Sequence, residues 1–211
     1  MRNPWLDIPL SDYEAHMALP SIGQSRMLGE TLASLVERYA PRSVAILGCA
    51  GGNGIERLAP MGLDRIVGVD INPEYVAATR ERFGKDLRNL ELYTADIESV
   101  GTLFASVDLV CAALVFEYVD VRKALSFVRR HLPPGGRCAT VLQRRHERIE
   151  RVSPSPYTSL RQLDSTSHWI EPEALRAEAE AAVFIHEHSS ELVSAGGKRF
   201  ALVVLRLRAD G

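Results

Sequence analysis

The sequence predicts an α/β fold built on a doubly wound, largely parallel sheet, and three observations support this prediction. Short apolar segments alternate with segments of helical periodicity through the middle of the chain. The strand segments are apolar throughout, which is typical of strands buried on both faces. Alternation of strands and helices favours right-handed crossovers into a parallel sheet. With 211 residues, the chain is expected to form a single domain.

The elements follow in order. Residues 1–20 show neither helical nor strand period, and we expect an arm laid over the domain. An amphipathic helix is predicted from about Ile22 to Tyr39 and ends at Pro41. Short apolar runs predict five strands, at residues 43–47, 65–69, 90–94, 107–112 and 137–143. Helices are predicted between them at residues 54–64, 74–83 and 122–132. Asn72 suits the N-cap of the second, with Pro73 at its first helical position.

The C-terminal part breaks this alternation. Residues 144–170 contain the charge run RRHERIER and the Ser/Pro-rich stretch SPSPYTS, and we expect an irregular surface insertion. A helix over about 172–182 and strands over 183–190 and 199–208 follow. The turn at Gly196 and Gly197 predicts an antiparallel hairpin at the sheet edge. The expected units are therefore an arm with its helix (1–40), a core (43–143), the insertion (144–170) and a terminal helix and hairpin (171–211).

Composition restricts the function. The net charge is −2, so the chain supplies no general field for phosphate backbones, and we expect no nucleic-acid partner. No stretch approaches 18 consecutive apolar residues, and the N-terminal residues carry acids where a signal peptide is apolar. We therefore expect a cytoplasmic protein without a membrane segment. Cys49, Cys111 and Cys138 lack metal-type spacing, which predicts reduced packing residues and no metal site.

Candidate ligand-binding residues follow the strands. In an open α/β sheet the ligand crevice lies beyond the carboxyl ends of the strands. The first strand leads into a run of small residues, from Gly48 to Gly54, which lets a ligand approach the backbone closely; a plain tight turn is the alternative. Asp70 ends the second strand, where it can accept hydrogen bonds from ribose hydroxyls or cap the next helix instead.

The dinucleotide-binding pattern G-x-G-x-x-G is incomplete here. Starting at Gly48, it requires glycines where the sequence has Ala50 and Asn53. The turn therefore favours a smaller ligand than a dinucleotide. Asp96 follows the third strand, where it can face the exocyclic amine of an adenine or act only as a turn residue.

Together these segments resemble class I S-adenosylmethionine-dependent methyltransferases. The resemblance rests on VAILGCAGGNGIERL, IVGVDINPEYVAATR, LYTADI, VDLVCAALVFEYV and LPPGGRCATVL, in family order over about residues 43–143. It implies a Rossmann-like seven-stranded sheet of order 3-2-1-4-5-7-6 with strand 7 antiparallel. It also implies S-adenosylmethionine as cofactor. The residues assigned to its pocket are Gly48, Cys49, Ala50, Gly52, Asp70, Ile71, Asp96, Ile97 and Leu114.

Within that pocket the resemblance assigns separate parts of the cofactor. Gly48, Ala50 and Gly52 lie against its methionine part, Asp70 binds its ribose, and Asp96 with Ile97 binds its adenine. The chain departs from the family at Ile46, where an acid is usual. A polar contact to the amino group of the cofactor must then come from elsewhere, such as a backbone carbonyl.

Candidate catalytic residues lie after the fourth strand and on the arm. The family places substrate-facing groups at Glu117 and Tyr118; a helix N-terminal acid and a packed aromatic are the alternatives. On the arm, Tyr13 is a candidate substrate contact and His16 a candidate base, although a lone arm histidine is more often a surface residue. The charge run Arg144–Arg151 is expected to be a solvated helical face, with binding of an anionic substrate as the alternative.

The leading functional hypothesis is methyl transfer to a small-molecule acceptor by direct displacement at the sulfonium methyl. In such a reaction the protein mainly aligns the nucleophile, the methyl group and the sulfur. A base is useful where the acceptor must lose a proton. A catalytically silent S-adenosylmethionine-binding regulatory module is the second hypothesis. A nicotinamide-dependent oxidoreductase is the third, disfavoured by the incomplete glycine pattern and by the absence of Tyr-x-x-x-Lys. Oxygen, nitrogen, sulfur and carbon acceptors stay open, as does the oligomeric state.

Overall fold

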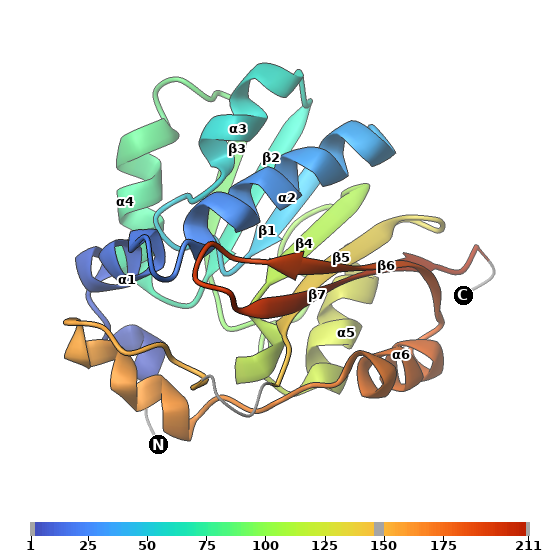
Figure 1. Ribbon diagram of the computed structural model, residues 1–211. Coiled ribbons are helices and arrows are strands. Elements are labelled where there is room, and N and C mark those ends of the chain that lie inside the picture. The colour runs from blue at the N-terminus through green and yellow to red at the C-terminus, as the bar shows by residue number, and fades with distance from the viewer. Residues whose placement is uncertain (1–2, 146–149, 210–211) are drawn as a thin grey trace.

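The computed structural model describes residues 3–145 and 150–209 and confirms the predicted sheet (Figure 1). The strand order is β3-β2-β1-β4-β5-β7-β6. Strands β1 to β5 pair in parallel, whereas β7 pairs antiparallel with both β5 and β6. The strand bounds are β1 Ser43–Leu47, β2 Arg65–Asp70, β3 Leu90–Thr94, β4 Leu109–Ala113, β5 Arg137–Gln143, β6 Phe184–Val193 and β7 Arg199–Leu207.

Helices cover both faces of the sheet. The α-helices are α1 Leu10–Ala18, α2 Gln24–Tyr39, α3 Ile55–Leu58, α4 Pro73–Phe83, α5 Val121–Arg130 and α6 Pro172–Ala181. The 3-10 helices are η1 Pro4–Leu6, η2 Ala59–Met61, η3 Phe116–Tyr118 and η4 Thr158–Ser165. Asn72 caps α4 as predicted, because its Oδ1 accepts a hydrogen bond from the amide of Glu74 at 2.9 Å. The helix predicted over 54–64 is shorter, since Pro60 lies in η2 and Gly62 adopts φ +68°.

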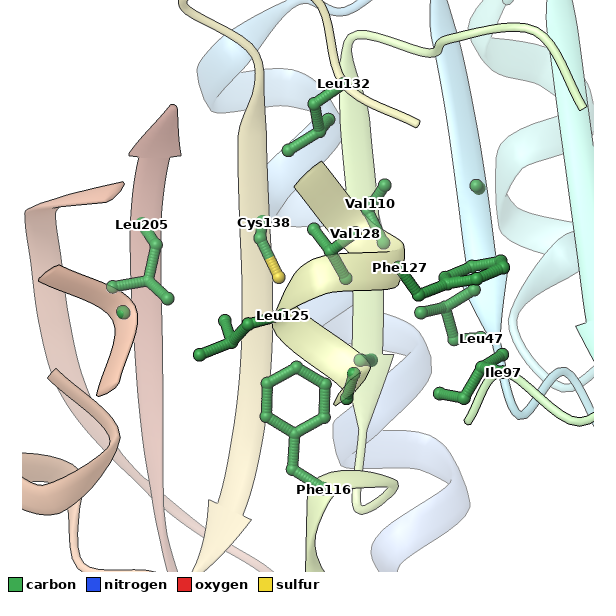
Figure 2. Packing of buried hydrophobic residues seen from close by; sticks show 14 of the residues in the cluster. Leu47, Ile97, Val110, Phe116, Leu125, Phe127, Val128, Leu132, Cys138 and Leu205 are labelled. Atoms are coloured by element: carbon green, nitrogen blue, oxygen red, sulfur yellow. The ribbon is translucent and has the colours of Figure 1, made fainter. Parts of the chain in front are cut away.

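Two apolar layers hold the sheet between the helices. Alternate residues of β1, such as Ala45 and Leu47, belong to the apolar layer that also contains side chains of α5 and α6. Leu125 and Phe127 of α5 are fully buried in this layer, and Figure 2 shows them with Leu47. Val44 and Ile46 face the other layer, with α2 and α3. Because both faces of the central strands are covered, their backbone and side chains are fixed, and the strand ends are held at defined positions.

The prediction that residues 1–20 lack helical period is wrong. Residues 10–18 form α1, and its inner face carries Tyr13, His16 and Met17, which are spaced three and four residues apart. The period is present in aromatic and polar side chains rather than in aliphatic ones, which is why the apolar pattern does not reveal it. The arm is attached to α4: Asn72 Nδ2 donates to the carbonyl of Trp5, and Tyr75 Oη donates to the carbonyl of Ile8, both at 2.9 Å.

The insertion is also more ordered than predicted. Its residues 158–165 form η4, and Leu160 and Leu163 are buried against Ile8 of the arm. Figure 1 shows α1 and η4 side by side below the strand ends. We call the arm residues 3–18 together with residues 150–170 the roof. Burial of apolar side chains from both segments explains why a Ser/Pro-rich stretch is held in place.

Smaller differences concern the edges of elements. The fourth strand begins at Leu109 rather than at 107, because the amide of Val107 donates instead to the carbonyl of His131 at 2.9 Å. Strand β6 continues to Val193 and carries an irregularity between His186 and His188. No helix among the described residues is long and apolar enough to cross a membrane.

Candidate active site

A cavity lies beyond the carboxyl ends of β1 to β5 and beneath the roof. Most residues predicted for the site line it, namely Tyr13, His16, Gly48, Ala50, Asp70, Ile71, Asp96, Ile97, Leu114, Glu117 and Tyr118. Cys49 and Gly52 are not among its lining residues. Ile46 packs in the apolar layer under α2, so no side chain from that position reaches the cavity. The topology therefore brings residues from five separate segments into one space.

The turn after β1 is shaped by left-handed backbone. Gly48, Ala50 and Gly52 adopt φ values of +67°, +48° and +90°. Ala50 is a non-glycine residue in this region, which costs of order 1 kcal/mol and is common near binding sites. A Cβ at Gly52 would meet the ring of Phe83 at 2.5 Å, so this glycine allows close packing of the turn against α4. Gly48 and Ala50 are the turn residues that face the cavity.

Asp70 joins the end of β2 to this turn. Its Oδ2 accepts a hydrogen bond from the amide of Ala50, and its Oδ1 accepts one from the amide of Asn72, both at 2.9 Å. Burial raises the pKa of this carboxyl, and the amides of Asn72 and Ala50 counteract that rise. Each carboxylate oxygen has a second lone pair, so the group retains capacity to accept hydrogen bonds from a diol.

Asp96 follows β3 on the same side of the sheet. Its Oδ1 accepts a hydrogen bond from the amide of Glu98 at 2.9 Å, as expected of a turn residue, yet the side chain also lines the cavity. The next residue, Ile97, is buried and forms part of the apolar layer. A carboxylate beside an apolar wall suits a flat ring that carries an amine.

Glu117 is the most unusual group in the cavity. Its side chain is 4% exposed, and its Oε1 accepts a hydrogen bond from the amide of Gln143 at 2.8 Å. Among the described residues, its Oε2 has no hydrogen-bond partner. Burial raises the pKa of this carboxyl to about 7, and the Gln143 amide only partly offsets that effect. A buried carboxyl with a free oxygen and such a pKa can exchange a proton near neutral pH.

The backbone around Glu117 fixes its position. Leu114 adopts φ +57° directly after β4, and its amide donates to the carbonyl of Val141 at 2.9 Å. The carbonyl of Glu117 accepts a hydrogen bond from the amide of His168 at 2.9 Å. The residue is thus anchored to β5 through its side chain and to the roof through its main chain.

The roof contributes His16, Tyr13 and Trp5. The imidazole Nδ1 of His16 lies 2.9 Å from Ser155 Oγ, and burial together with nearby Lys198 lowers the pKa of this histidine. The rings of Tyr13 and Tyr118 both pack edge-on against Trp5, at centroid distances of 5.6 and 5.1 Å. Burial raises the pKa of both phenols. The roof therefore presents neutral aromatic and imidazole groups at neutral pH.

Two cationic residues also line the cavity: Lys198, which the sequence does not single out, and Arg151, the last residue of the charge run. Lys198, directly before β7, is buried, and its Nζ donates to the carbonyl of Arg151 at 2.6 Å. Arg151 closes the charge run predicted to be a solvated helical face. Instead its guanidinium donates to the carbonyl of Ser167 and lies 5.1 Å from the ring centre of Trp169. Residues 146–149 of that run lie outside the described residues.

The three cysteines are buried and form no disulfide. Burial raises the pKa of each thiol, to about 12 for Cys138. They therefore stay protonated, in keeping with packing rather than nucleophilic chemistry. Among the described residues, no group of three or more His, Cys, Asp or Glu side chains is arranged to hold a metal ion.

The sheet order, the left-handed turn and the acids at successive strand ends define a Rossmann-like fold of the methyltransferase class. A family model described as "Methyltransferase domain" matches residues 46–140. Over the matched residues the chain is similar to methyltransferases, and it shares its fold with S-adenosylmethionine-dependent methyltransferases of known structure.

A curated relative and three solved structures show the range of similar proteins. An uncharacterized methyltransferase of Mycobacterium tuberculosis is 30% identical over 156 residues, covering 64% of this chain. The chain spans 62% of the length of that relative. An S-adenosylmethionine-dependent methyltransferase from Mesorhizobium loti has a TM-score of 0.62 at 20% identity, over 78% of this chain and 90% of that one.

The magnesium protoporphyrin IX methyltransferase of Synechocystis PCC 6803, solved with bound S-adenosylhomocysteine, has a TM-score of 0.67 at 12% identity, over 88% of this chain and 84% of that one. The [4+2]-cyclase SpnF has a TM-score of 0.65 at 15% identity, over 84% of this chain and 81% of that one. At these identities the likeness concerns the fold, which carries more than one chemistry.

Proposed function

We propose that this protein transfers a methyl group from S-adenosylmethionine to a small-molecule acceptor by direct displacement and releases S-adenosylhomocysteine. The observation that carries the proposal is a shared cavity. Asp70 and Asp96, the two acids suited to an adenosine, line the same space as Glu117, whose Oε2 has no partner among the described residues. The groups that we propose for cofactor binding and for proton acceptance therefore belong to one cavity.

The residues at the strand ends fit the cofactor in order. Asp70 would accept hydrogen bonds from the ribose hydroxyls through its remaining lone pairs. Asp96 and Ile97 would receive the adenine, with Ile71 and Leu114 as apolar neighbours. Gly48 and Ala50 would lie against the methionine part, where the absence of larger side chains lets the ligand approach the backbone. Since Ile46 points into the apolar layer, the amino group of the cofactor would take its polar contact from the backbone.

The chain's own residues would act on the acceptor. When bound, S-adenosylmethionine supplies an activated methyl group on sulfur. Glu117 Oε2 would take the proton of an acceptor hydroxyl or amine, a role suited to its pKa of about 7. His16 is a second candidate base, because burial lowers its pKa and favours the neutral imidazole. Tyr13 and Tyr118 would orient the acceptor, and the roof would exclude water from it.

Calorimetric titration with S-adenosylmethionine, S-adenosylhomocysteine and NAD tests the cofactor assignment. We expect the first two to bind and NAD not to bind; binding of NAD alone would reject the proposal. Turnover is tested by incubation with a metabolite pool and quantification of S-adenosylhomocysteine.

A catalytically silent S-adenosylmethionine-binding module is the second candidate. It is favoured by Ile46, which lies in the apolar layer where an acid is usual and so removes a usual cofactor contact. Tight cofactor binding without S-adenosylhomocysteine release from any pool would support this second candidate over the first.

A further inference from the structure

Lys198 is a buried cation in the wall of the cavity. It is 4% exposed, although it follows the glycine turn between β6 and β7, where a lysine would ordinarily be solvated. The turn is buried because it packs on the segment before α2: the amide of Gly196 faces the carbonyl of Ile22 at 3.4 Å, and a Cβ at Gly196 would meet the carbonyl oxygen of Ser21 at 1.9 Å. Close backbone contact therefore directs the next side chain inward.

The ammonium of Lys198 has unused hydrogen-bonding capacity. Its one hydrogen bond among the described residues goes to a neutral acceptor, the carbonyl of Arg151. Asp164 and Glu150 act on it electrostatically but form no ion pair with it in the described part of the chain. Burial lowers the pKa of Lys198 to about 8, so the group is mostly charged at pH 7. An ammonium has three donors, and a buried charge without an anionic partner is costly.

The surroundings of Lys198 are apolar and aromatic. Apolar and aromatic residues line the cavity together with Lys198 and Glu117, among them Trp169, Leu160, Leu163 and Tyr118. Hydrogen bonds connect the two ends through the roof: Lys198 binds the carbonyl of Arg151, whose guanidinium binds Ser167, and the neighbouring His168 binds the carbonyl of Glu117. The acceptor end of the cavity thus has a cationic pole, apolar walls and a proton acceptor.

We propose that Lys198 binds the carboxylate of the methyl acceptor, which is a small aromatic or otherwise apolar carboxylic acid. Arg151 adds positive charge to the same pole, and Glu117 faces the part of the acceptor that receives the methyl group. The identification of the bound acid as the methyl acceptor rests on the proposed function. The existence of an acid-binding site at Lys198 does not depend on turnover.

Charge balance favours a carboxylate over a phosphate. The pole has one fully buried cation, Lys198. The positive charge of the partly buried Arg151 is offset by Asp164 and Glu150 nearby, and burial lowers the pKa of His16. A carboxylate carries one negative charge and neutralises one ammonium, whereas a phosphate monoester carries about 1.5 to 2 charges at pH 7 and would leave an excess in an apolar cavity.

The test uses matched ligand pairs on the full chain. Binding of phenylacetate and 3-phenylpropionate is compared with binding of their primary amides and of phenyl phosphate by ligand-detected NMR titration. We expect the acids to bind at least about tenfold more tightly than the amides, consistent with one charge-assisted hydrogen-bonded pair. Amides that bind as well as acids, or no binding of either acid, would overturn the proposal, and a preference for the phosphate would overturn the choice of carboxylate.

Variants assign the preference to Lys198. In K198M the acid preference should fall to within about twofold, while K123M, which alters an exposed lysine on α5, should retain it. Replacing a buried charge by an apolar side chain of similar length is commonly tolerated, and thermal unfolding checks this. K198Q serves as a second variant should K198M not fold. An acid preference that survives in the folded Lys198 variant would reject the assignment.

Titrations with and without S-adenosylhomocysteine separate this inference from the proposed function. Failure of S-adenosylhomocysteine to bind would reject the proposed function, whereas a Lys198-dependent preference for acids in the cofactor-free protein would still support the acid-binding site. Binding of S-adenosylhomocysteine without any preference for acids would support the proposed function and reject the acid-binding site.

Discussion

The carboxylate of Asp70 accepts a hydrogen bond from the amide of Ala50 at 2.9 Å, across the gap between two neighbouring parallel strands. The same carboxylate accepts the amide of Asn72, the cap of α4. One side chain therefore sets the shape of the turn after β1 and the start of α4. Asp70 also lines the cavity, so its structural role and the proposed binding role fall on one residue.

Substitution of Asp70 should weaken cofactor binding. D70A removes hydrogen bonds to a charged group worth about 1 to 3 kcal/mol, which corresponds to roughly 5- to 150-fold weaker binding of S-adenosylhomocysteine by calorimetry. D86A, at an exposed aspartate after α4, is the matched control and should bind normally. If D70A bound S-adenosylhomocysteine with unchanged affinity, the proposal that Asp70 binds the ribose would be wrong.

Substitution of Glu117 should separate turnover from cofactor binding. E117Q keeps an oxygen for the Gln143 amide but cannot accept a proton, so the rate with a protic acceptor should fall by about 10²- to 10⁴-fold. Affinity for S-adenosylhomocysteine should change less than about twofold. In the wild type, kcat should rise with pH and level off above about pH 7, where Glu117 is ionised. A full rate in E117Q would show that Glu117 is not the base.

The same variant should alter stability in a pH-dependent way. Burial raises the Glu117 pKa from its ordinary 4.5 to about 7, so the folded protein binds this proton more tightly than the unfolded chain does. This contribution to stability is complete below about pH 4.5 and is lost as the pH rises to about 7. It amounts to about 3 kcal/mol.

Because E117Q lacks this ionisation, it should become more stable than the wild type above pH 7, and the difference should shrink toward pH 4.5. Urea unfolding at pH 4.5, 6 and 8 measures it. A stability difference that is constant across these three pH values would contradict the raised pKa.

The arm should control cofactor release. The carboxylate of Glu14 on α1 pairs with the guanidinium of Arg82 on α4, which also donates to the carbonyl of Gly51 in the turn, at 2.9 Å. The pair is partly exposed, so E14Q should cost less than about 1 kcal/mol of stability. Release of S-adenosylhomocysteine should nevertheless become severalfold faster in stopped-flow measurements. E37Q on the exposed face of α2 is the control, and equal release rates in the two variants would argue against a role of the arm.

The central sheet was predictable because its strands are buried on both faces and read as continuous apolar runs. The turn at Gly48 to Gly54 and Asp70 were predictable for a related reason: the sequence places them directly after strands, and the carboxyl ends of parallel strands lie together. The sheet order itself came from the family resemblance, since apolar runs do not specify which strands are neighbours.

The roof was not predictable in the same way. Helix α1 buries His16 and Met17 and half-buries Tyr13, and the mixed polarity of these three side chains hides the helical period. Lys198 reads as a solvated turn residue, and its burial depends on contact with a segment more than 170 residues earlier in the chain, at Ser21 and Ile22. Such contacts arise from tertiary packing and leave no local pattern in the sequence.

The cavity is formed partly by the strand ends and partly by the roof, so cofactor binding and acceptor preference can change separately. The groups assigned to adenosine come from the sheet, whose positions are constrained by two apolar layers. The groups assigned to the acceptor come mostly from peripheral segments and from the hairpin turn. Exchange of those peripheral segments between related chains is therefore a direct route to new acceptor preference, with the nucleoside-binding scaffold left intact.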